Sequence, residues 1–244
     1  MRTFVGTSGY SYKQWKGRFY PEKMKEPEML RFYAQRFPTV EINNTFYRMP
    51  SRDVLARWAG ETPDGFTFVL KAPQRITHQK RLGAVADDVD YLLRTAEAMG
   101  PKLGPLLFQL PPYLKKDVAR LRSFLELLPA TCRAAFEFRH ETWFDDEVRA
   151  ALRERKAALC AADTDEGGAA AEVIPTADWG YLRLRRADYG EDQLRSWADR
   201  IRAQPWQDAF VFFKHEDEAK GPELAERLSD LLGPETQRSQ SSAE

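Results

Sequence analysis

Short apolar runs alternate with amphipathic stretches along almost the whole chain of 244 residues. The apolar runs have the length of buried strands, whereas the stretches between them carry apolar residues at the i, i+3, i+4 spacing of helices. Because strand patterns return about every 30 residues with a helix pattern between them, the sequence predicts βαβ units and a parallel sheet. The predicted strands are residues 3–6, 39–42, 66–70, 106–110, 133–139, 157–162, 179–184 and 209–213.

Helices are predicted between these strands, and residues that cap or break helices mark several of their ends. Ser51 is a residue type favoured at an N-cap, and Gly60 is favoured where a helix closes. Pro38 and Pro129 end two other helical patterns, because proline cannot continue a helix. The predicted helices are residues 27–37, 51–60, 89–99, 117–128, 145–156, 193–203 and 222–232.

Eight parallel strands in a chain of this length favour a TIM-type (β/α)₈ barrel, formed as a single domain over residues 1–236. Residues 164–177 contain a glycine pair and a proline, so we expect irregularity around the sixth and seventh strands. The polar run 237–244 predicts a flexible tail. The alternative is an open doubly wound sheet, but Gly6-Thr7-Ser8-Gly9 has the spacing of neither the Rossmann nor the Walker fingerprint.

The composition excludes several classes of protein. Lys plus Arg and Asp plus Glu both total 37, so no overall field attracts nucleic acid or an anionic membrane, and any anion binding must come from a local cluster. Two cysteines, Cys132 and Cys160, argue against a disulfide framework and fit a reducing compartment. No apolar run is long enough to span a membrane. We therefore expect a cytoplasmic protein with no membrane partner; the oligomeric state is left open.

Polar residues gather where the predicted strands end. In the fifth strand Glu137 and Arg139 alternate with apolar residues and point to one face, with His140 just beyond. The carboxyl ends of the strands form the active site in barrels of this type, so we expect these residues to converge. The candidate residues at these ends are Thr7, Ser8, Glu41, Asn43, Lys71, Gln109, Glu137, Arg139, His140, Asp163, Arg183, Arg185, Lys214 and His215.

This ring of candidates is rich in cations, which favours an anionic substrate such as a phosphate ester or a nucleic-acid backbone. The leading hypothesis is a hydrolase or lyase acting on such a substrate. A non-catalytic module that binds an anionic small molecule or nucleic acid is the first alternative. A glycoside hydrolase is the second, and it requires the carboxyl groups of Glu41 and Glu137 to lie about 5 to 10 Å apart. In the leading hypothesis Arg139, Lys71 and Arg183 hold the anion, Glu137 or Glu41 is the base, and His140 is the proton donor.

Aromatic residues in the loops after the first, second and fifth predicted strands give a second indication. Aromatic rings beside cations stack bases or line sugar sites. The alternative is that these rings close the barrel top and pack on the loops. The residues are Tyr10, Tyr12, Trp15, Phe46, Tyr47, Trp143 and Phe144.

The sequence leaves the cofactor open. The three histidines, His78, His140 and His215, form neither an HxH nor an HExxH pair. A divalent metal held by Glu137, His140, Asp163 and His215 is compatible with the residue types, but the ligand spacing does not indicate one. We therefore assign no metal ligand.

Five separated motifs follow one another along the chain. They are Gly6-Thr7-Ser8-Gly9-Tyr10-Ser11-Tyr12 with Trp15 and Phe19-Tyr20-Pro21, Val40-Glu41-Ile42-Asn43-Asn44-Thr45-Phe46-Tyr47, Lys71-Ala72-Pro73 with Ile76-Thr77-His78, Leu107-Phe108-Gln109-Leu110-Pro111-Pro112, and Phe136-Glu137-Phe138-Arg139-His140 with Trp143-Phe144. At these motifs the chain resembles the DUF72 family, of which YecE-like proteins are members.

The resemblance covers nearly the whole chain and implies a TIM-type barrel with a cleft lined by the motifs, His78 included. It implies no reaction, because the family is named for its unknown function. Many members carry a His-Gly pair where this chain has Leu184-Arg185-Arg186, and an Asn-Asn-Asp-like run where it has Phe213-Lys214-His215-Glu216-Asp217. Similarity to sugar-isomerase and endonuclease IV-type barrels is an analogy of fold alone.

Overall fold

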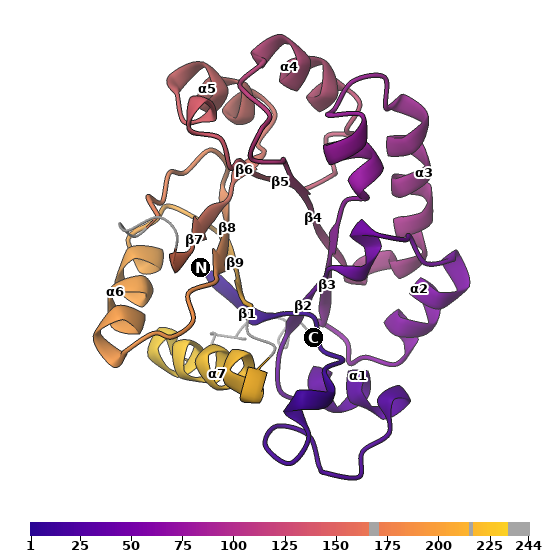
Figure 1. Cartoon of the computed structure of the whole chain (residues 1–244), viewed down its shortest axis with the longest axis vertical. Helices are drawn as coiled ribbons and strands as arrows, with labels where there is room; N and C mark the ends of the chain where they lie inside the picture. The colour runs from indigo at the N-terminus through magenta and orange to yellow at the C-terminus, as the bar shows by residue number, and fades with distance from the viewer. Residues whose placement is uncertain (166–170, 215–216, 234–244) are drawn as a thin grey trace, which may run out of the picture.

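A computed structural model describes residues 1–165, 171–214 and 217–233. Nine parallel strands form one sheet that curves into a nearly closed barrel with helices around it (Figure 1). The architecture is therefore the predicted TIM-like barrel. The strands are β1 (Arg2–Ser8), β2 (Thr39–Ile42), β3 (Thr67–Lys71), β4 (Leu103–Gln109), β5 (Ala134–Glu137), β6 (Ala158–Leu159), β7 (Ala161–Asp163), β8 (Trp179–Leu184) and β9 (Asp208–Phe213).

The sixth predicted strand is broken in two, which is the irregularity expected in this region. The order in the sheet is β6-β5-β4-β3-β2-β1-β9-β8-β7, so β6 and β7 are its two ends. Cys160 lies between them, and its backbone N–H donates to the carbonyl oxygen of Phe136 at 2.9 Å. Since β6 pairs with β5 and β7 pairs with β8, this one broken run brings the two ends of the sheet together.

Each of the seven predicted helices is present, and most bounds differ from the prediction by a few residues. Residues 97–99 of the third predicted helix belong to a separate short helix, Glu97–Lys102, in which Pro101 lies. Parts of two predictions fall outside the described residues, namely residues 166–170 of the irregular loop and the 237–244 tail. The helices are α1 (Glu26–Ala34), α2 (Arg52–Gly60), α3 (Ala86–Ala96), α4 (Val118–Glu126), α5 (Asp146–Glu154), α6 (Glu191–Arg202) and α7 (Lys220–Leu232).

Strand alternation separates the core into two parts. In β3, Val69 belongs to a small cluster, whereas its neighbours Phe68 and Leu70 belong to a larger one. The small cluster contains residues of six strands and fills the barrel interior, while the larger one lies between the sheet and the helices. Whether a side chain faces the barrel axis or the helix layer therefore depends on whether it occupies an odd or an even position along its strand. We call this position its strand parity.

The N-cap of α2 provides a small test of the local structure. The hydroxyl of Ser51 accepts a hydrogen bond from the backbone N–H of Val54 at 3.4 Å, a long contact. We expect Ser51→Ala to lower the free energy of unfolding by about 0.5–1 kcal/mol, whereas Ser51→Gly costs only a few tenths, because glycine leaves the cap open to water. Urea denaturation of the two variants beside the wild type measures the difference. Equal stability of the alanine variant and the wild type would contradict the assignment.

Across the described parts of the chain, none of the helices combines the length and the apolar character needed to cross a membrane.

Candidate functional site

Strand parity places five of the predicted polar residues inside the barrel, near the carboxyl ends of their strands. Phe136 and Leu182 belong to the cluster on the helix side, so Glu137 and Arg183, one residue further along, face the axis. The same alternation turns Glu41 of β2, Lys71 of β3 and Gln109 of β4 toward the interior. The sequence prediction that these strand ends converge is confirmed for this group.

A buried ion triad forms the centre of the group. Arg183 Nη2 donates to Glu41 Oε1 at 2.8 Å, and Arg183 Nη1 donates to Glu137 Oε2 at 2.5 Å. The three side chains are at most 3% exposed. One guanidinium therefore joins two carboxylates from strands that are far apart in the sequence, β2 and β5. Arg183 Nε is also buried and has no hydrogen-bond partner among the described residues.

Neutral donors complete the shell of Glu41. Its carboxylate accepts from Tyr181 Oη at 2.6 Å, Ser8 Oγ at 2.8 Å and Asn43 Nδ2 at 3.2 Å. Burial alone raises the pKa of such a carboxyl, but the charge of Arg183 and the hydrogen bonds from Tyr181 and Ser8 outweigh it, so the pKa of Glu41 is lowered. Glu41 therefore remains ionised at neutral pH.

Glu137 is held in the same way but by more cations. It accepts from Gln109 Nε2 and Arg139 Nε, each at 3.0 Å, and Arg185 Nη1 lies 3.7 Å from its Oε1. Burial opposes ionisation, yet the charges of Arg183, Arg139 and Arg185 lower the pKa of Glu137 to about 2. Neither glutamate is protonated at neutral pH, so neither is placed to donate a proton.

Three further cations lie around the triad, and together they give the cluster a positive balance. They are Lys71, Arg139 and Arg185; with Arg183 they make four cations against two carboxylates, a net charge of 4 − 2 = +2 when Lys71 is protonated. Burial, followed by the charge of Arg183, lowers the pKa of Lys71 to about 8. Arg185 Nε and Nη1 are buried without a hydrogen-bond partner among the described residues. The cluster thus holds N–H groups that lack acceptors.

His78 and Lys71 both contact the ring of Phe46. Lys71 Nζ is 4.0 Å from the centre of the Phe46 ring, and the His78 ring meets Phe46 edge-on at 4.9 Å between centres. His78 Nδ1 is 2.9 Å from Thr77 Oγ1. Burial and then the charges of Lys71 and Arg139 lower the pKa of His78, so its ring is neutral at pH 7. The structure thus brings an imidazole next to the cluster.

His140 lies just beyond β5, where it caps the next short helix. Its Nδ1 accepts from the backbone N–H of Thr142 at 3.2 Å and lies 3.0 Å from the Thr142 hydroxyl, so the ring caps the short helix Glu141–Trp143. Lys214 places its backbone N–H on the carbonyl oxygen of Leu184 at 3.2 Å. His215 lies outside the described residues.

Two candidates from the strand ends point into the helix layer instead. Thr7 has the parity of Val5, and its hydroxyl and backbone N–H both lie 2.9 Å from the Tyr33 hydroxyl of α1. Asp163 has the parity of Ala161 and accepts from Arg186 Nε at 2.9 Å and Tyr189 Oη at 3.0 Å. Strand parity therefore separates these two residues from the ion triad.

The candidate aromatic residues divide into buried and open ones. Trp15 is 1% exposed among Tyr12, Phe19 and Tyr20. Trp143 is also 1% exposed; it is stacked on Phe138 at 4.6 Å and donates its indole N–H to the carbonyl oxygen of Leu114 at 2.7 Å. These two rings pack the loops, as the alternative interpretation expected. By contrast, Phe46 and Tyr10 are partly open, and Tyr47 and Phe144 are exposed.

One residue of the cluster, Tyr181, was not named from the sequence. It precedes Arg183 by two positions on β8 and donates to Glu41. Arg185, which the sequence did single out, follows Arg183 by two positions and lies 3.7 Å from Glu137. The signal that could have found Tyr181 is the same alternation that singled out Glu137 and Arg139. Within the described residues, no three His, Cys, Asp or Glu side chains are grouped as metal ligands would be.

The sequence matches the family described as "Protein of unknown function DUF72" over residues 4–244. Among curated proteins, the UPF0759 protein YecE of Escherichia coli (strain K12) is 34% identical over 116 residues, which cover 47% of this chain and 43% of YecE. The UPF0759 protein YunF of Bacillus subtilis (strain 168) is 29% identical over 150 residues, which cover 58% of this chain and 52% of YunF. The chain thus spans about half the length of the curated relatives that it matches.

Solved structures show the same fold. A DUF72 family protein from Thermotoga maritima aligns with a TM-score of 0.82 at 26% identity, covering 96% of this chain and 100% of that one. A DUF72 family protein from Enterococcus faecalis aligns with a TM-score of 0.71 at 16% identity, covering 98% and 100%. The second likeness concerns the fold alone, and the family description assigns no activity.

Proposed function

This chain belongs to the DUF72 family, which carries no assigned activity, and from its site we propose that it is an enzyme, a hydrolase or lyase, acting on an anionic substrate. The substrate class is a phosphate ester or a nucleic-acid-derived compound. The site is the cationic cluster at the carboxyl ends of β3, β5 and β8, formed by Lys71, Arg139 and Arg185 around the ion triad.

One observation carries this proposal: Arg185 holds buried N–H groups without acceptors beside a cluster of net charge +2. A buried donor without an acceptor costs free energy, and an anion that accepts from it removes that cost. Guanidinium groups match the oxygens of phosphate in pairs, and Arg139 contacts the same Glu137 oxygen, Oε1, that lies 3.7 Å from Arg185. The arrangement therefore favours an anion with several oxygens.

Lys71 and His78 are the groups best suited to proton transfer. At pH 7 an amine with a pKa of about 8 is mostly protonated yet gives up its proton readily, while the neutral His78 ring can accept one. In ester hydrolysis a water oxygen attacks phosphorus and passes its proton to His78. The bond from phosphorus to the leaving oxygen breaks, and that oxygen takes a proton from Lys71. This assignment differs from the sequence hypothesis, in which Glu41, Glu137 and His140 had these roles.

The glycoside alternative receives less support from the same contacts. That reaction needs one carboxyl group to be protonated as the general acid. Arg183 lies between Glu41 and Glu137 and favours the charged form of both. In this proposal the two glutamates orient Arg183, Arg139 and Arg185 and do not take part in proton transfer.

Anion binding is the first measurable consequence. We expect inorganic phosphate to bind the wild type, and we expect Arg185→Gln to weaken binding about tenfold to hundredfold, because a hydrogen bond to a charged group contributes about 1.5–3 kcal/mol. Isothermal titration calorimetry at low and high salt measures the affinity, which should fall as ionic strength rises. Arg122→Gln, which removes an exposed arginine paired with Glu154 on the outer surface, is the matched control.

Turnover separates the enzyme from a binding module. The wild type is assayed on phosphomonoesters, phosphodiesters and DNA with abasic sites. Turnover that depends on Arg185 supports the proposal. Phosphate binding without turnover on any substrate favours the non-catalytic module, and absence of phosphate binding overturns both.

The cysteines support the expected cytoplasmic location, which is part of this proposal. Cys132 and Cys160 are unbridged, and Cys160 is buried. Burial raises the pKa of the Cys132 thiol to about 11, so it is a poor nucleophile at neutral pH. Both residues act as small apolar side chains, which suits a reducing compartment.

A further inference from the structure

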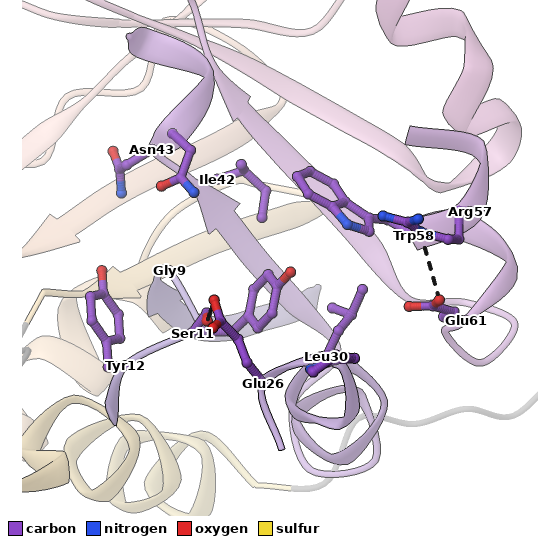
Figure 2. A pocket seen from close by; sticks show the side chains of 13 residues that line it. Gly9, Ser11, Tyr12, Glu26, Leu30, Ile42, Asn43, Arg57, Trp58 and Glu61 are labelled. Atoms are coloured by element: carbon purple, nitrogen blue, oxygen red, sulfur yellow. Dashed lines mark hydrogen bonds and ion pairs between the residues drawn. The ribbon is translucent and has the colours of Figure 1, made fainter. Parts of the chain in front are cut away.

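A second candidate site lies beside the cationic cluster, at the same end of the barrel. A cavity of about 530 Å³ opens between α1, α2 and the loops that follow β1 and β2. Figure 2 shows Asn43, Ile42 and Trp58 along one side of it and Ser11, Glu26 and Leu30 along the other. Its size falls in the range of about 300–1,000 Å³ that is usual for small-molecule sites.

The loop that forms one wall is held in place by its own hydrogen bonds. Gly9 has a φ of +95°, and its backbone N–H donates to the carbonyl oxygen of Glu41 at 2.8 Å. A Cβ on Gly9 would lie 2.3 Å from the Tyr12 hydroxyl oxygen, and that hydroxyl donates to the carbonyl oxygen of Ser8 at 2.6 Å. Tyr20 Oη donates to the carbonyl oxygen of Tyr10 at 2.5 Å. The wall is therefore formed before any ligand arrives.

The lining combines aromatic surface with hydrogen-bond acceptors. Trp58 is partly open, and its ring is stacked near Phe68 with 6.5 Å between centres and a 20° angle, which fixes its orientation. Tyr10 also lines the cavity. Leu30 and Ile42, which are both buried, add apolar side chains to the lining.

The charge of the lining argues against a phosphate in this cavity. Two carboxylates, Glu26 and Glu61, stand against one guanidinium, Arg57, which lies 3.9 Å from Glu61; the balance is 1 − 2 = −1. The two carboxylates and the side-chain oxygen of Asn43 accept hydrogen bonds, whereas Arg57 only donates them. A ligand that fits has an apolar face for the rings, many hydroxyl donors for the acceptors, and no negative charge.

We propose that this cavity is a carbohydrate-binding site that takes a neutral sugar unit. A sugar ring presents C–H groups on its face and hydroxyls at its edge, which matches the rings of Trp58 and Tyr10 and the carboxylates of Glu26 and Glu61. A nucleobase has too few hydrogen-bond donors for the acceptors that line this cavity. Asn43 lines the cavity and also donates to Glu41 at 3.2 Å, so the two sites meet there. The proposed sugar site contains none of the cations of the proposed anion site, so it is a function beyond that one.

Saturation-transfer NMR on the full chain tests this site directly. The probes are the methyl glycosides of glucose, galactose, mannose and N-acetylglucosamine, with adenosine as a comparison. We expect saturation transfer to at least one glycoside and a loss of affinity of about tenfold or more in Trp58→Ala, since one stacking contact has about that effect. Tyr91→Ala removes an exposed ring on α3 that does not line the cavity and should leave binding unchanged.

Two further variants keep the test decisive. Glu61→Gln preserves the packing and removes one acceptor charge, so it should weaken sugar binding even if Trp58→Ala fails to fold. Arg139→Gln should weaken phosphate binding while leaving sugar binding unchanged, which separates this inference from the proposed function. Binding of no glycoside, tighter binding of adenosine, or unchanged affinity in both Trp58→Ala and Glu61→Gln would overturn the inference.

Discussion

Replacing Arg183 with methionine is expected to lower the free energy of unfolding by about 3–5 kcal/mol at pH 8, because it leaves the buried Glu41 carboxylate with neutral hydrogen-bond donors only and removes the closest cation from Glu137. Glu41 and Glu137 are at most 1% exposed, so water cannot take the place of the guanidinium without opening the barrel interior. Methionine fills similar volume, which keeps the cavity effect small. Urea denaturation followed by circular dichroism measures the loss.

The pH dependence of this loss has a defined sign. In the wild type the pKa of Glu137 is about 2, below its ordinary value of 4.5, so its ionised form contributes stability above pH 4.5 that is lost as the pH falls toward 2. In Arg183→Met, Glu137 keeps Arg139 and Arg185, but Glu41 keeps only neutral hydrogen-bond donors, so burial raises its folded-state pKa above the unfolded one. A carboxyl group of that kind destabilises the fold increasingly as pH rises from its unfolded-state pKa to its folded-state pKa. The deficit should therefore be larger at pH 8 than at pH 5.

A surface ion pair provides the matched control. Arg122 pairs with Glu154 across exposed faces of α4 and α5, and Arg122→Met should leave the free energy of unfolding nearly unchanged at either pH, because water replaces an exposed partner. Adding Glu41→Gln to Arg183→Met should recover part of the loss, since the buried carboxylate that lost its cation is replaced by a neutral amide. A deficit below about 1 kcal/mol at pH 8, or one that does not change with pH, would show that the triad is not a buried charge network of this kind.

The two-residue alternation along the strands accounts for most of what could be predicted from the sequence about the fold and the site. The alternation of short apolar runs with helical spacing predicts the barrel, and within β5 the same two-residue period places Glu137 on the interior face. Where parity was not applied, the prediction grouped residues that the fold separates. Thr7 and Asp163 stand at strand ends but have outward parity, so each hydrogen-bonds a side chain of the helix layer.

The ion pairs that cross the barrel could not be predicted from the sequence. Arg183 pairs with Glu41 and Glu137, which are 142 and 46 positions away, and one sequence holds no signal that links them. Arg183 was therefore predicted to bind the anion of the substrate, whereas both of its terminal nitrogens already donate to carboxylates. Trp15 and Trp143 illustrate a second limit, because an aromatic residue in a loop has the same sequence signature whether it is open or buried. The cavity near Trp58 is built from separate segments and has no periodic signal at all.

Lys71 should titrate near pH 8, well below the ordinary lysine pKa of 10.5, because it is buried beside Arg183. Carbon-13 NMR of the lysine ε-carbons reads this midpoint without any substrate, and Lys71→Arg assigns the signal by removing it. Arg139→Gln removes one neighbouring positive charge and should move the midpoint upward. A midpoint at 10 or above in the wild type would contradict the buried, cation-rich setting of the amine.

The same pKa predicts the activity profile of the proposed enzyme on whichever phosphate ester it turns over. Lys71→Met should lower kcat about 10²–10⁴-fold, the usual contribution of a general acid. If the ammonium form donates the proton, kcat falls as pH rises through about 8, and the acid limb lies below 6.5 because His78 must be neutral. Lys71→Arg keeps the charge but holds its proton too tightly, so it should retain phosphate binding, lose kcat, and lose the limb at pH 8. A limb at pH 8 that persists in Lys71→Arg would remove Lys71 from the proton transfer while leaving the anion site intact.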